Sequence, residues 1–269
     1  MSIARQRSRA LQALVTIASD ATDFTERERD DSLLPHALAC LEYGDRLGIE
    51  TETVGRLKNH TGVHLSNNAR YSEAEPMLEQ ALNLRRKLFG PEHVDVAVSM
   101  TNLADVYKEW GRYEEAASLT KQALELWTRL TVPDDPHVAL AMNNLGTVYE
   151  AQGRYTEAEP LYERALEIFK QSPEPEHRYV AVSMHSVAQV YRAQGRYGDA
   201  KPLYERALEL ALRTLGPEHP YAAAFMDSLA GWHRTQRCYE EAERLYRQAL
   251  ALRKKLLGRE HPDVRVGYR

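Results

Sequence analysis

The stretch LGTVYEAQGRYTEAEPLYERALEIF, residues 145–169, decides the fold because parts of it recur at a fixed interval. Its Gly153-Arg154-Tyr155 segment returns as Gly111-Arg112-Tyr113 and Gly195-Arg196-Tyr197. A tyrosine and two alanines recur every 42 residues, at Tyr71, Tyr113, Tyr155, Tyr197 and Tyr239, at Ala74, Ala116, Ala158, Ala200 and Ala242, and at Ala81, Ala123, Ala165, Ala207 and Ala249. A period of about 20 to 50 residues is typical of a repeat protein.

Within each period the apolar residues follow helical spacing. Val106 and Tyr107 belong to one such stripe, and Ala116, Leu119 and Ala123 to the next, so each repeat is predicted to be two helices. Glycines should end the helices, at Gly111, Gly153 and Gly195 for the first helix and at Gly90, Gly216 and Gly258 for the second. Three prolines, Pro76, Pro160 and Pro202, are expected at the beginning of the second helix, where a missing amide hydrogen costs little.

The third repeat resembles the tetratricopeptide repeat through Leu145-Gly146, Tyr149, Gly153, Tyr155, Ala158, Tyr162 and Ala165. The longer period and the Gly216–Pro220 connector are similar to the repeats of kinesin light chains and of the C-terminal arms of STAND-type signalling ATPases. This resemblance implies an all-α fold, a right-handed superhelical solenoid of antiparallel helix pairs. It also implies a protein or peptide ligand in a concave groove.

The period predicts five repeats, at residues 51–92, 93–134, 135–176, 177–218 and 219–260. Residues 1–50 should form a helical lead-in that packs on the solenoid, with helices over 5–19 and 33–47, and residues 261–269 begin an incomplete sixth repeat. Repeat one has Lys58, Thr61 and Leu65 where later copies have Met, Leu and Tyr. Such polar substitutions are expected of a terminal cap.

No complete helix pair follows the fifth repeat in the sequence. We therefore expect an exposed apolar strip at this end, carrying Leu245, Tyr246, Leu250 and Leu252. Either the chain is a piece of a longer protein, or this end docks on a partner or a second copy.

Composition excludes several classes of protein. The chain has 269 residues, 43% hydrophobic and 28% charged, with a net charge of -4, and no run of eighteen apolar residues. We expect no membrane span, and no nucleic-acid partner because there is no long basic run. Cys40 and Cys238 form neither a disulfide framework nor a zinc motif, which favours a reducing, cytoplasmic location. Three arginines and no acid in residues 1–19 leave a mitochondrial presequence as the alternative.

Catalytic motifs are lacking. The sequence has neither the phosphate-binding GxxxxGK[ST] nor the nucleophile motif GxSxG, so we expect no enzyme activity and no cofactor. No metal site is expected either. His60 and His64 share a helical face without the acid of a metalloprotease motif, and the connector histidines, His93, His177, His219 and His261, should make local hydrogen bonds. Most of the 15 tyrosines sit in repeat columns and are interpreted as packing residues.

The candidate site is the groove face of the first helices. The resemblance places there Asn59, Asn102, Asp105, Lys108, Asn143, Asn144, Thr147, His185, Gln189, Arg192 and Arg234. Asparagine amides can pair with the backbone of an extended peptide. In kinesin light chains the corresponding asparagine pair contacts cargo peptide, and Asn143-Asn144 repeats it. A solvated polar face without a ligand is the alternative.

Charge is uneven along this face. Asp105, Glu109 and Glu150 lie in repeats two and three, whereas His185, Arg192, His233 and Arg234 lie in repeats four and five, interrupted by Asp227. An acidic stretch of a ligand should therefore lie against the C-terminal repeats. The main hypothesis is a non-enzymatic scaffold. The alternative is a ligand-sensing regulatory arm detached from a STAND-type signalling ATPase.

Overall fold

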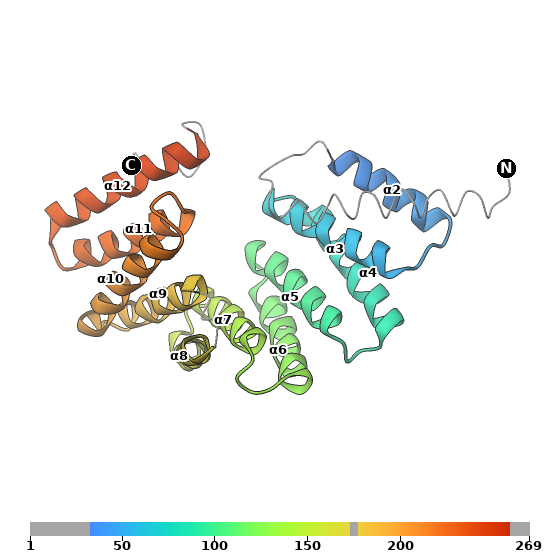
Figure 1. Cartoon of the computed structure of the whole chain (residues 1–269), viewed down its shortest axis with the longest axis horizontal. Coiled ribbons are helices and arrows are strands. Elements are labelled where there is room, and N and C mark those ends of the chain that lie inside the picture. Colours follow the sequence, from blue (N-terminus) through green and yellow to red (C-terminus); the bar gives the residue numbers. More distant parts are fainter. Residues whose placement is uncertain (1–32, 173–176, 259–269) are drawn as a thin grey trace. The chain divides into compact units, whose positions relative to one another are not determined.

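The computed structural model describes residues 33–172 and 177–258, and every regular element within these ranges is a helix (Figure 1). The helices are α2 (Leu34–Arg46), α3 (Glu52–Asn67), α4 (Tyr71–Phe89), α5 (Val94–Glu109), α6 (Tyr113–Leu130), α7 (Pro136–Ala151), α8 (Tyr155–Gln171), α9 (His177–Ala193), α10 (Tyr197–Thr214), α11 (Pro220–Thr235) and α12 (Tyr239–Leu257). The predicted all-α fold of helix pairs is confirmed, and the helix expected over 33–47 is α2. The helix expected over 5–19 and the segment 261–269 lie outside the described residues.

The helices fall into two compact units, with the boundary between Pro133 and Asp134. Unit 1 holds α2 to α6 and unit 2 holds α7 to α12. We call α3, α5, α7, α9 and α11 the first helices, and α4, α6, α8, α10 and α12 the second helices. Within each unit a first helix packs against its own second helix, and that second helix packs against the next first helix. Neighbouring first helices also touch, in the pairs α3–α5, α7–α9 and α9–α11.

The alanine columns are the tightest part of the core. Ala158 and Ala165 are 0% exposed, and their counterparts in the other second helices are also buried. Small side chains at these positions let the two helices of a pair approach closely, and larger side chains fill the space beside them. Tyr162 and Tyr204 do this, with side chains 0% and 1% exposed.

Tyrosines at the starts of the second helices behave differently. The packing prediction is wrong for Tyr113, Tyr197 and Tyr239, which are 36%, 37% and 63% exposed. Each is the first residue of its helix. The sequence column alone does not distinguish this end position from the buried middle of the helix.

Glycines end the first helices as predicted. Gly111, Gly153 and Gly195 have φ of +80°, +73° and +79°, in the left-handed region that glycine enters without a steric penalty. In the first and fifth repeats the same position is taken by Ala69 and Arg237, with φ of +58° and +61°. These two residues keep the turn despite carrying a side chain.

The predicted place of the prolines is wrong by more than one turn. Pro76, Pro160 and Pro202 lie inside α4, α8 and α10, at the sixth position of each, because these helices begin at the tyrosine after the Arg of the turn. A proline there removes one backbone hydrogen bond. All three prolines are exposed, so water can reach the carbonyl that loses its partner.

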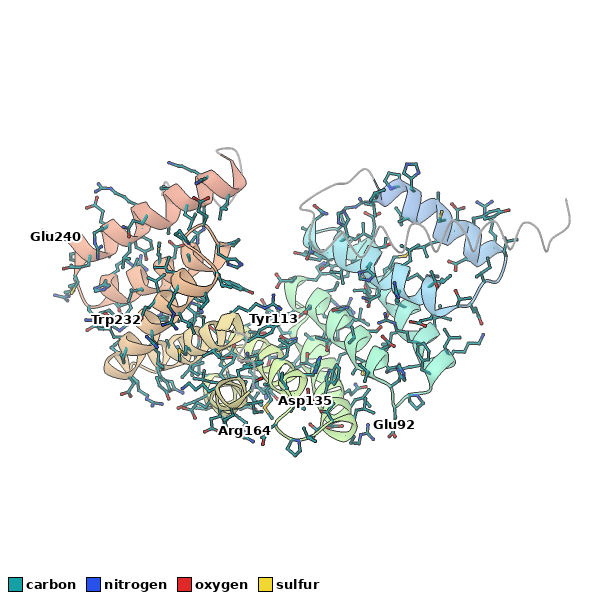
Figure 2. The ribbon with its side chains drawn as sticks, in the orientation of Figure 1. Glu92, Tyr113, Asp135, Arg164, Trp232 and Glu240 are labelled. Carbon is teal, nitrogen blue, oxygen red and sulfur yellow. The ribbon has the colours of Figure 1, made fainter. Side chains whose placement is uncertain are left out.

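Connector side chains cap the first helices. Asp135, labelled in Figure 2, accepts a hydrogen bond from the His137 amide at 2.8 Å. His93 and His219 do the same through Nδ1, each at 3.2 Å from the amide two residues on. The expected local hydrogen bonding of the connector histidines is confirmed for these two, whereas the side chains of His177 and His261 are not among those described.

Candidate peptide-binding face

The predicted site residues lie on first helices, in two separate groups. The unit-1 face is formed by α3 and α5 and carries Asn59, Asn102, Asp105 and Lys108. The unit-2 face is formed by α7, α9 and α11 and carries Asn143, Asn144, Thr147, His185, Gln189, Arg192 and Arg234. Repeat spacing places the residues of each group on neighbouring helices that touch.

On the unit-1 face, the polar groups are largely paired with one another. Asn102 donates from Nδ2 to Oδ1 of Asn59 at 3.1 Å, and Asn59 is only 5% exposed. The Lys108 ammonium lies 3.6 Å from Asp105 and 3.3 Å from Glu109. Burial acts to lower the pKa of Lys108, but the charges and hydrogen bonds of these two carboxylates together outweigh it and keep the pKa above its usual value. Asn59 therefore joins two repeats, and Lys108 is neutralised within its own helix.

Asn143 of the unit-2 face is buried as well. Its Nδ2 donates to Oγ of Ser183 on α9 at 2.8 Å, which links α7 to α9. Its Oδ1 is sealed from solvent and has no hydrogen-bond partner. Thr147 donates to the backbone oxygen of Asn144 at 2.8 Å, while the Asn144 side chain is partly exposed. Of the asparagine pair, Asn144 is the one that a ligand reaches first.

His185 carries no positive charge at neutral pH. Its ring stacks on Phe225 at 4.5 Å between centroids, and Nε2 lies 2.8 Å from Oγ of Ser228 and 3.1 Å from Nε2 of Gln189. Burial, and then the charge of Arg192, lower the pKa of His185 to about 4. The predicted cationic contribution of His185 is therefore wrong, because the sequence does not reveal the ring's apolar surroundings.

The other charges on the unit-2 face are also changed by their neighbours. Asp227 forms an ion pair with Arg253 of α12, so its carboxylate is already compensated. Burial, and then the charge of Lys201, lower the pKa of His233. Arg192 and Arg234 are left as the cations expected on this face.

Arg192 of the unit-2 face has a buried atom without a partner. Its Nε is sealed from solvent without a hydrogen-bond partner, and no carboxylate of the described residues lies within ion-pair distance. The buried Tyr204 hydroxyl lies beside Arg192: burial raises the pKa of Tyr204, and the charge and hydrogen-bonding capacity of Arg192 partly offset this. One repeat earlier, Tyr162 donates to Oε2 of Glu150 at 2.9 Å. Burial raises the pKa of Glu150, and this hydrogen bond and then the charge of Arg192 partly offset the increase.

Arg234 lies at the edge of the unit-2 face. It is exposed and borders a shallow pocket of about 350 Å³ against α12, together with Tyr239, Tyr246 and Leu250. The structure therefore brings Arg192 together with Glu150, His185 and Tyr204, and places Arg234 beside the last helix.

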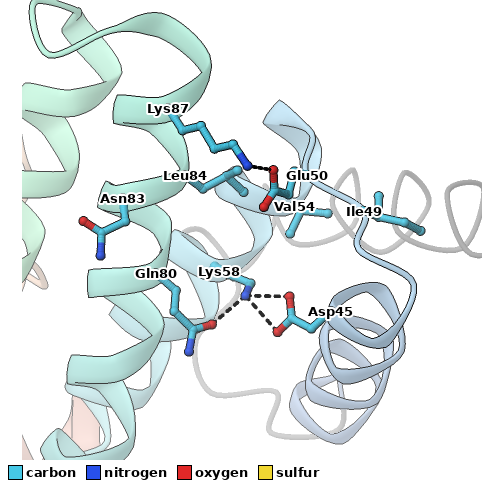
Figure 3. A pocket seen from close by; sticks show the side chains of 9 residues that line it. All are labelled: Asp45, Ile49, Glu50, Val54, Lys58, Gln80, Asn83, Leu84 and Lys87. Atoms are coloured by element: carbon cyan, nitrogen blue, oxygen red, sulfur yellow. Dashed lines mark hydrogen bonds and ion pairs between the residues drawn. The ribbon is translucent and has the colours of Figure 1, made fainter.

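A second pocket, missed by the sequence analysis, lies between α2, α3 and α4 (Figure 3). Its volume is about 420 Å³. Lys58, buried on one wall, donates to both carboxylate oxygens of Asp45 at 2.8 and 2.9 Å and to Oε1 of Gln80 at 2.5 Å. The predicted polar cap therefore faces α2 instead of solvent. The sequence did contain a sign of this buried ion pair. Lys58 stands in a column that otherwise holds the apolar residues Met100, Met142, Met184 and Met226, so a lysine there is expected to be buried and to need a partner.

Metal ligands do not gather in the part of the chain that the structure describes. No group of three His, Cys, Asp or Glu residues there could hold an ion. His64 is 9% exposed and lies 3.3 Å from Nδ2 of Asn68, while burial and the charges of Arg56 and Arg85 lower the pKa of His60. No helix among the described residues is long and apolar enough to cross a membrane.

Comparison with known proteins agrees with this repeat geometry. The tetratricopeptide repeat model matches residues 54–129, 137–213 and 179–255. The chain belongs to the tetratricopeptide repeat family. No curated protein sequence matches it significantly.

Solved structures share the fold. One is a kinesin light chain protein from Podosopora anserina, whose own TPR-like repeats are nearly identical to one another. It is 26% identical to this chain with a TM-score of 0.61, and the match covers 78% of this chain and 99% of that one. BtubC (BKLC) from P. vanneervenii is 19% identical with a TM-score of 0.64, covering 97% and 94%. A Rap protein complexed with competence and sporulation factor is 14% identical with a TM-score of 0.66, covering 93% and 76%. The chain is thus similar to kinesin light chain-like repeats.

Proposed function

We propose that this tetratricopeptide repeat protein is a non-enzymatic scaffold that binds a peptide or a helix of another protein on the faces of its first helices. The family and the kinesin light chain-like repeats support an interaction role. The two faces offer amide, hydroxyl and charged groups on helices that hold one another in place, which suits recognition of a chain with its own backbone donors and acceptors.

The observation that supports a specific binding position on the unit-2 face is the Arg192 guanidinium, whose buried Nε has no hydrogen-bond partner. A buried polar group without a partner costs stability, and a charged one costs more. A carboxylate side chain of the ligand would supply a counter-ion within hydrogen-bond distance, closer than Glu150. Arg192 can offer it two parallel hydrogen bonds, a geometry in which arginine is strong.

Neighbouring residues of the unit-2 face would orient the rest of the ligand. Asn144 and Gln189 are partly exposed on adjacent helices and each has an amide able to pair with an extended backbone. Asn143 and His185 hold α7, α9 and α11 together through Ser183 and Ser228, so we assign them to positioning. On the unit-1 face, Asn102 occupies the same repeat position as Asn144 and would likewise contact the ligand backbone.

The proposal can be tested by selecting binders from a random-peptide display library with the full chain. We expect selected peptides to be enriched in Asp or Glu, and the Arg192→Gln variant to bind them about tenfold or more weakly. Arg213→Gln is the matched control, because Arg213 lies in the last turn of the second helix α10 of the same unit. This control should leave affinity unchanged.

Different results would contradict different parts of the proposal. Peptides that bind without acidic enrichment, and equally to the Arg192→Gln variant, would refute the carboxylate subsite and keep the scaffold. A folded chain that selects no peptide would refute peptide binding. The double variant Asn144→Ala, Gln189→Ala should lower affinity for all selected peptides, because it removes backbone contacts that do not depend on ligand sequence.

The regulatory-arm alternative rests on the sequence resemblance to STAND-type signalling ATPases. It predicts a phosphate-binding loop domain encoded upstream of Met1 in the same genome. Reading the genomic sequence there decides between the two functions, because a scaffold needs no nucleotide-binding domain.

A further inference from the structure

The outer face of α12 differs from the same face of the other second helices in unit 2. Tyr162 of α8 and Tyr204 of α10 are 0% and 1% exposed, because α9 and α11 pack against those helices. Tyr246 stands at the equivalent position of α12 and is 36% exposed, and Tyr239 is 63% exposed. Leu245 is 6% exposed in the core, so it does not belong to the exposed strip in which the sequence analysis placed it.

The side chains on this face of α12 form one stripe. Tyr239, Ala242, Glu243, Tyr246, Arg247 and Leu250 line the shallow pocket beside Arg234. Their spacing of three and four residues is that of one side of a helix, so a second helix could lie along it. Its large apolar members, Tyr239, Tyr246 and Leu250, would then be covered as Tyr162 and Tyr204 are in the interior.

The charges on this stripe show which helix fits. In two interior second helices, α4 and α8, a glutamate pairs with an arginine from the next repeat: Arg112 donates to Glu75 at 2.7 Å and Arg196 to Glu159 at 2.5 Å. Glu243 occupies the same column. Its partner is Arg247 of its own helix, at 2.6 Å, and both side chains are well exposed.

Arg247 is itself a departure from the repeat. Its column holds Glu79, Glu163 and Glu205 in three other second helices, with Lys121 in α6. Glu163 accepts a hydrogen bond from the Tyr191 hydroxyl of the following helix at 2.5 Å. The Arg247 guanidinium cannot accept a hydrogen bond of this kind. A helix that packs on α12 would need an acidic side chain opposite Arg247 to pair with its charge.

We propose that α12 pairs with α12 of a second copy of the chain, antiparallel and about a two-fold axis close to residue 245. Glu243 and Arg247 are equally far from residue 245. In this arrangement Glu243 of each copy therefore meets Arg247 of the other, and Arg247 takes the role that the arginine of the next repeat plays in the interior. A two-fold contact must be self-complementary, and the opposite charges of Glu243 and Arg247 on this stripe satisfy that requirement. The inference is independent of the proposed peptide-binding function.

Sedimentation velocity on the full chain, from about 1 µM to about 500 µM, tests the pairing. One helix pair is a small interface, so we expect a weak dimer that dissociates on dilution and with added salt. Glu243→Arg and Arg247→Glu should each weaken dimerisation by about tenfold or more, because each places like charges opposite one another. The double variant Glu243→Arg, Arg247→Glu should restore it, since the swapped charges again meet their opposites across the axis.

A matched control lies on α2, where Glu42 and Arg46 form another exposed pair four residues apart, at 2.5 Å. Reversing either charge there should leave dimerisation unchanged. A wild-type chain that stays monomeric over the whole concentration range would overturn the proposal. So would single variants that dimerise like wild type, or a double variant that is not restored although its circular dichroism melt matches wild type.

Discussion

At the scale of single residues, two backbone positions stand out because they are left-handed without being glycine. Ala69 and Arg237 close the first helices of repeats one and five where the other repeats use glycine. A Cβ in this conformation destabilises the fold by about 1–2 kcal/mol. Glycine removes this steric cost, but its greater conformational freedom in the unfolded chain offsets about half of the gain in stability.

We predict that Ala69→Gly raises the free energy of unfolding by about 0.5–1 kcal/mol, because the Cβ clash disappears and the turn is unchanged. Urea denaturation measures it. The reverse change, Gly153→Ala, is the control and should lower the free energy of unfolding by about 1 kcal/mol. A loss of stability in Ala69→Gly would show that the strain is absent.

His185 makes stability depend on pH. Its pKa is about 4 in the folded chain, against 6.5 for an unperturbed histidine. Between these values the unfolded chain binds a proton that the folded chain does not, so stability falls as pH drops from about 6.5 to about 4.

We predict that His185→Gln removes this part of the pH dependence, which amounts to at most about 3 kcal/mol. Glutamine keeps a polar side chain next to Ser228 but does not titrate. Denaturation of both proteins at several pH values from 7 to 4 measures the difference. If the free energy of unfolding fell with pH equally in both proteins, another titrating group would be responsible for the loss of stability at acidic pH.

At the scale of elements, α2 is held to unit 1 by polar as well as apolar contacts. Its Asp45 meets the buried Lys58 of α3, and Glu50, just after α2, forms an ion pair with Lys87 of α4 (Figure 3). The apolar contribution comes from Leu41 and Ile49, which join the cluster around Leu57.

We predict that Asp45→Asn lowers the free energy of unfolding by about 1–2 kcal/mol, because it removes the carboxylate charge that compensates the buried Lys58 ammonium and one of its two acceptor oxygens. Glu42→Gln, which breaks the exposed pair with Arg46, should change stability by less than about 0.5 kcal/mol. Hydrogen exchange should show α2 opening first in Asp45→Asn. Equal effects of the two variants would contradict the structural role of Lys58.

At the scale of the whole molecule, packing is local within each unit. Each helix that the structure describes contacts only helices one or two steps away along the chain. In repeat arrays of this kind, stability is close to a sum of contributions from repeats and their nearest neighbours. A destabilising mutation in one unit should therefore affect mainly the helices of that unit.

We predict that Leu57→Ala, which empties a fully buried position of unit 1, costs about 2–5 kcal/mol. Amide exchange should accelerate in α2, α3 and α4 and stay near the wild-type rate in α10, α11 and α12. The reciprocal variant, Leu229→Ala in the α11 cluster, should give the opposite pattern. Uniform acceleration along the chain in either variant would show that the two units unfold together.

The sequence by itself determined the helices, their pairing and the family, because the 42-residue period, the alanine columns and the glycine turns are local signals that recur from repeat to repeat. A column such as that of Ala158 carries the same physical requirement in every copy. It also indicated which helices carry the candidate face, although not which side chains on that face are available.

Only the tertiary structure decided the state of those side chains. Asn143 and His185 look like free polar groups in the sequence, yet one bridges α7 to α9 and the other is neutral against Phe225. Lys58 reads as a solvated cap and is in fact buried on Asp45. The physical reason is that burial, ion pairing and pKa depend on neighbours 13 to 43 residues away, and a repeat period fixes the position of a residue without fixing what lies opposite it.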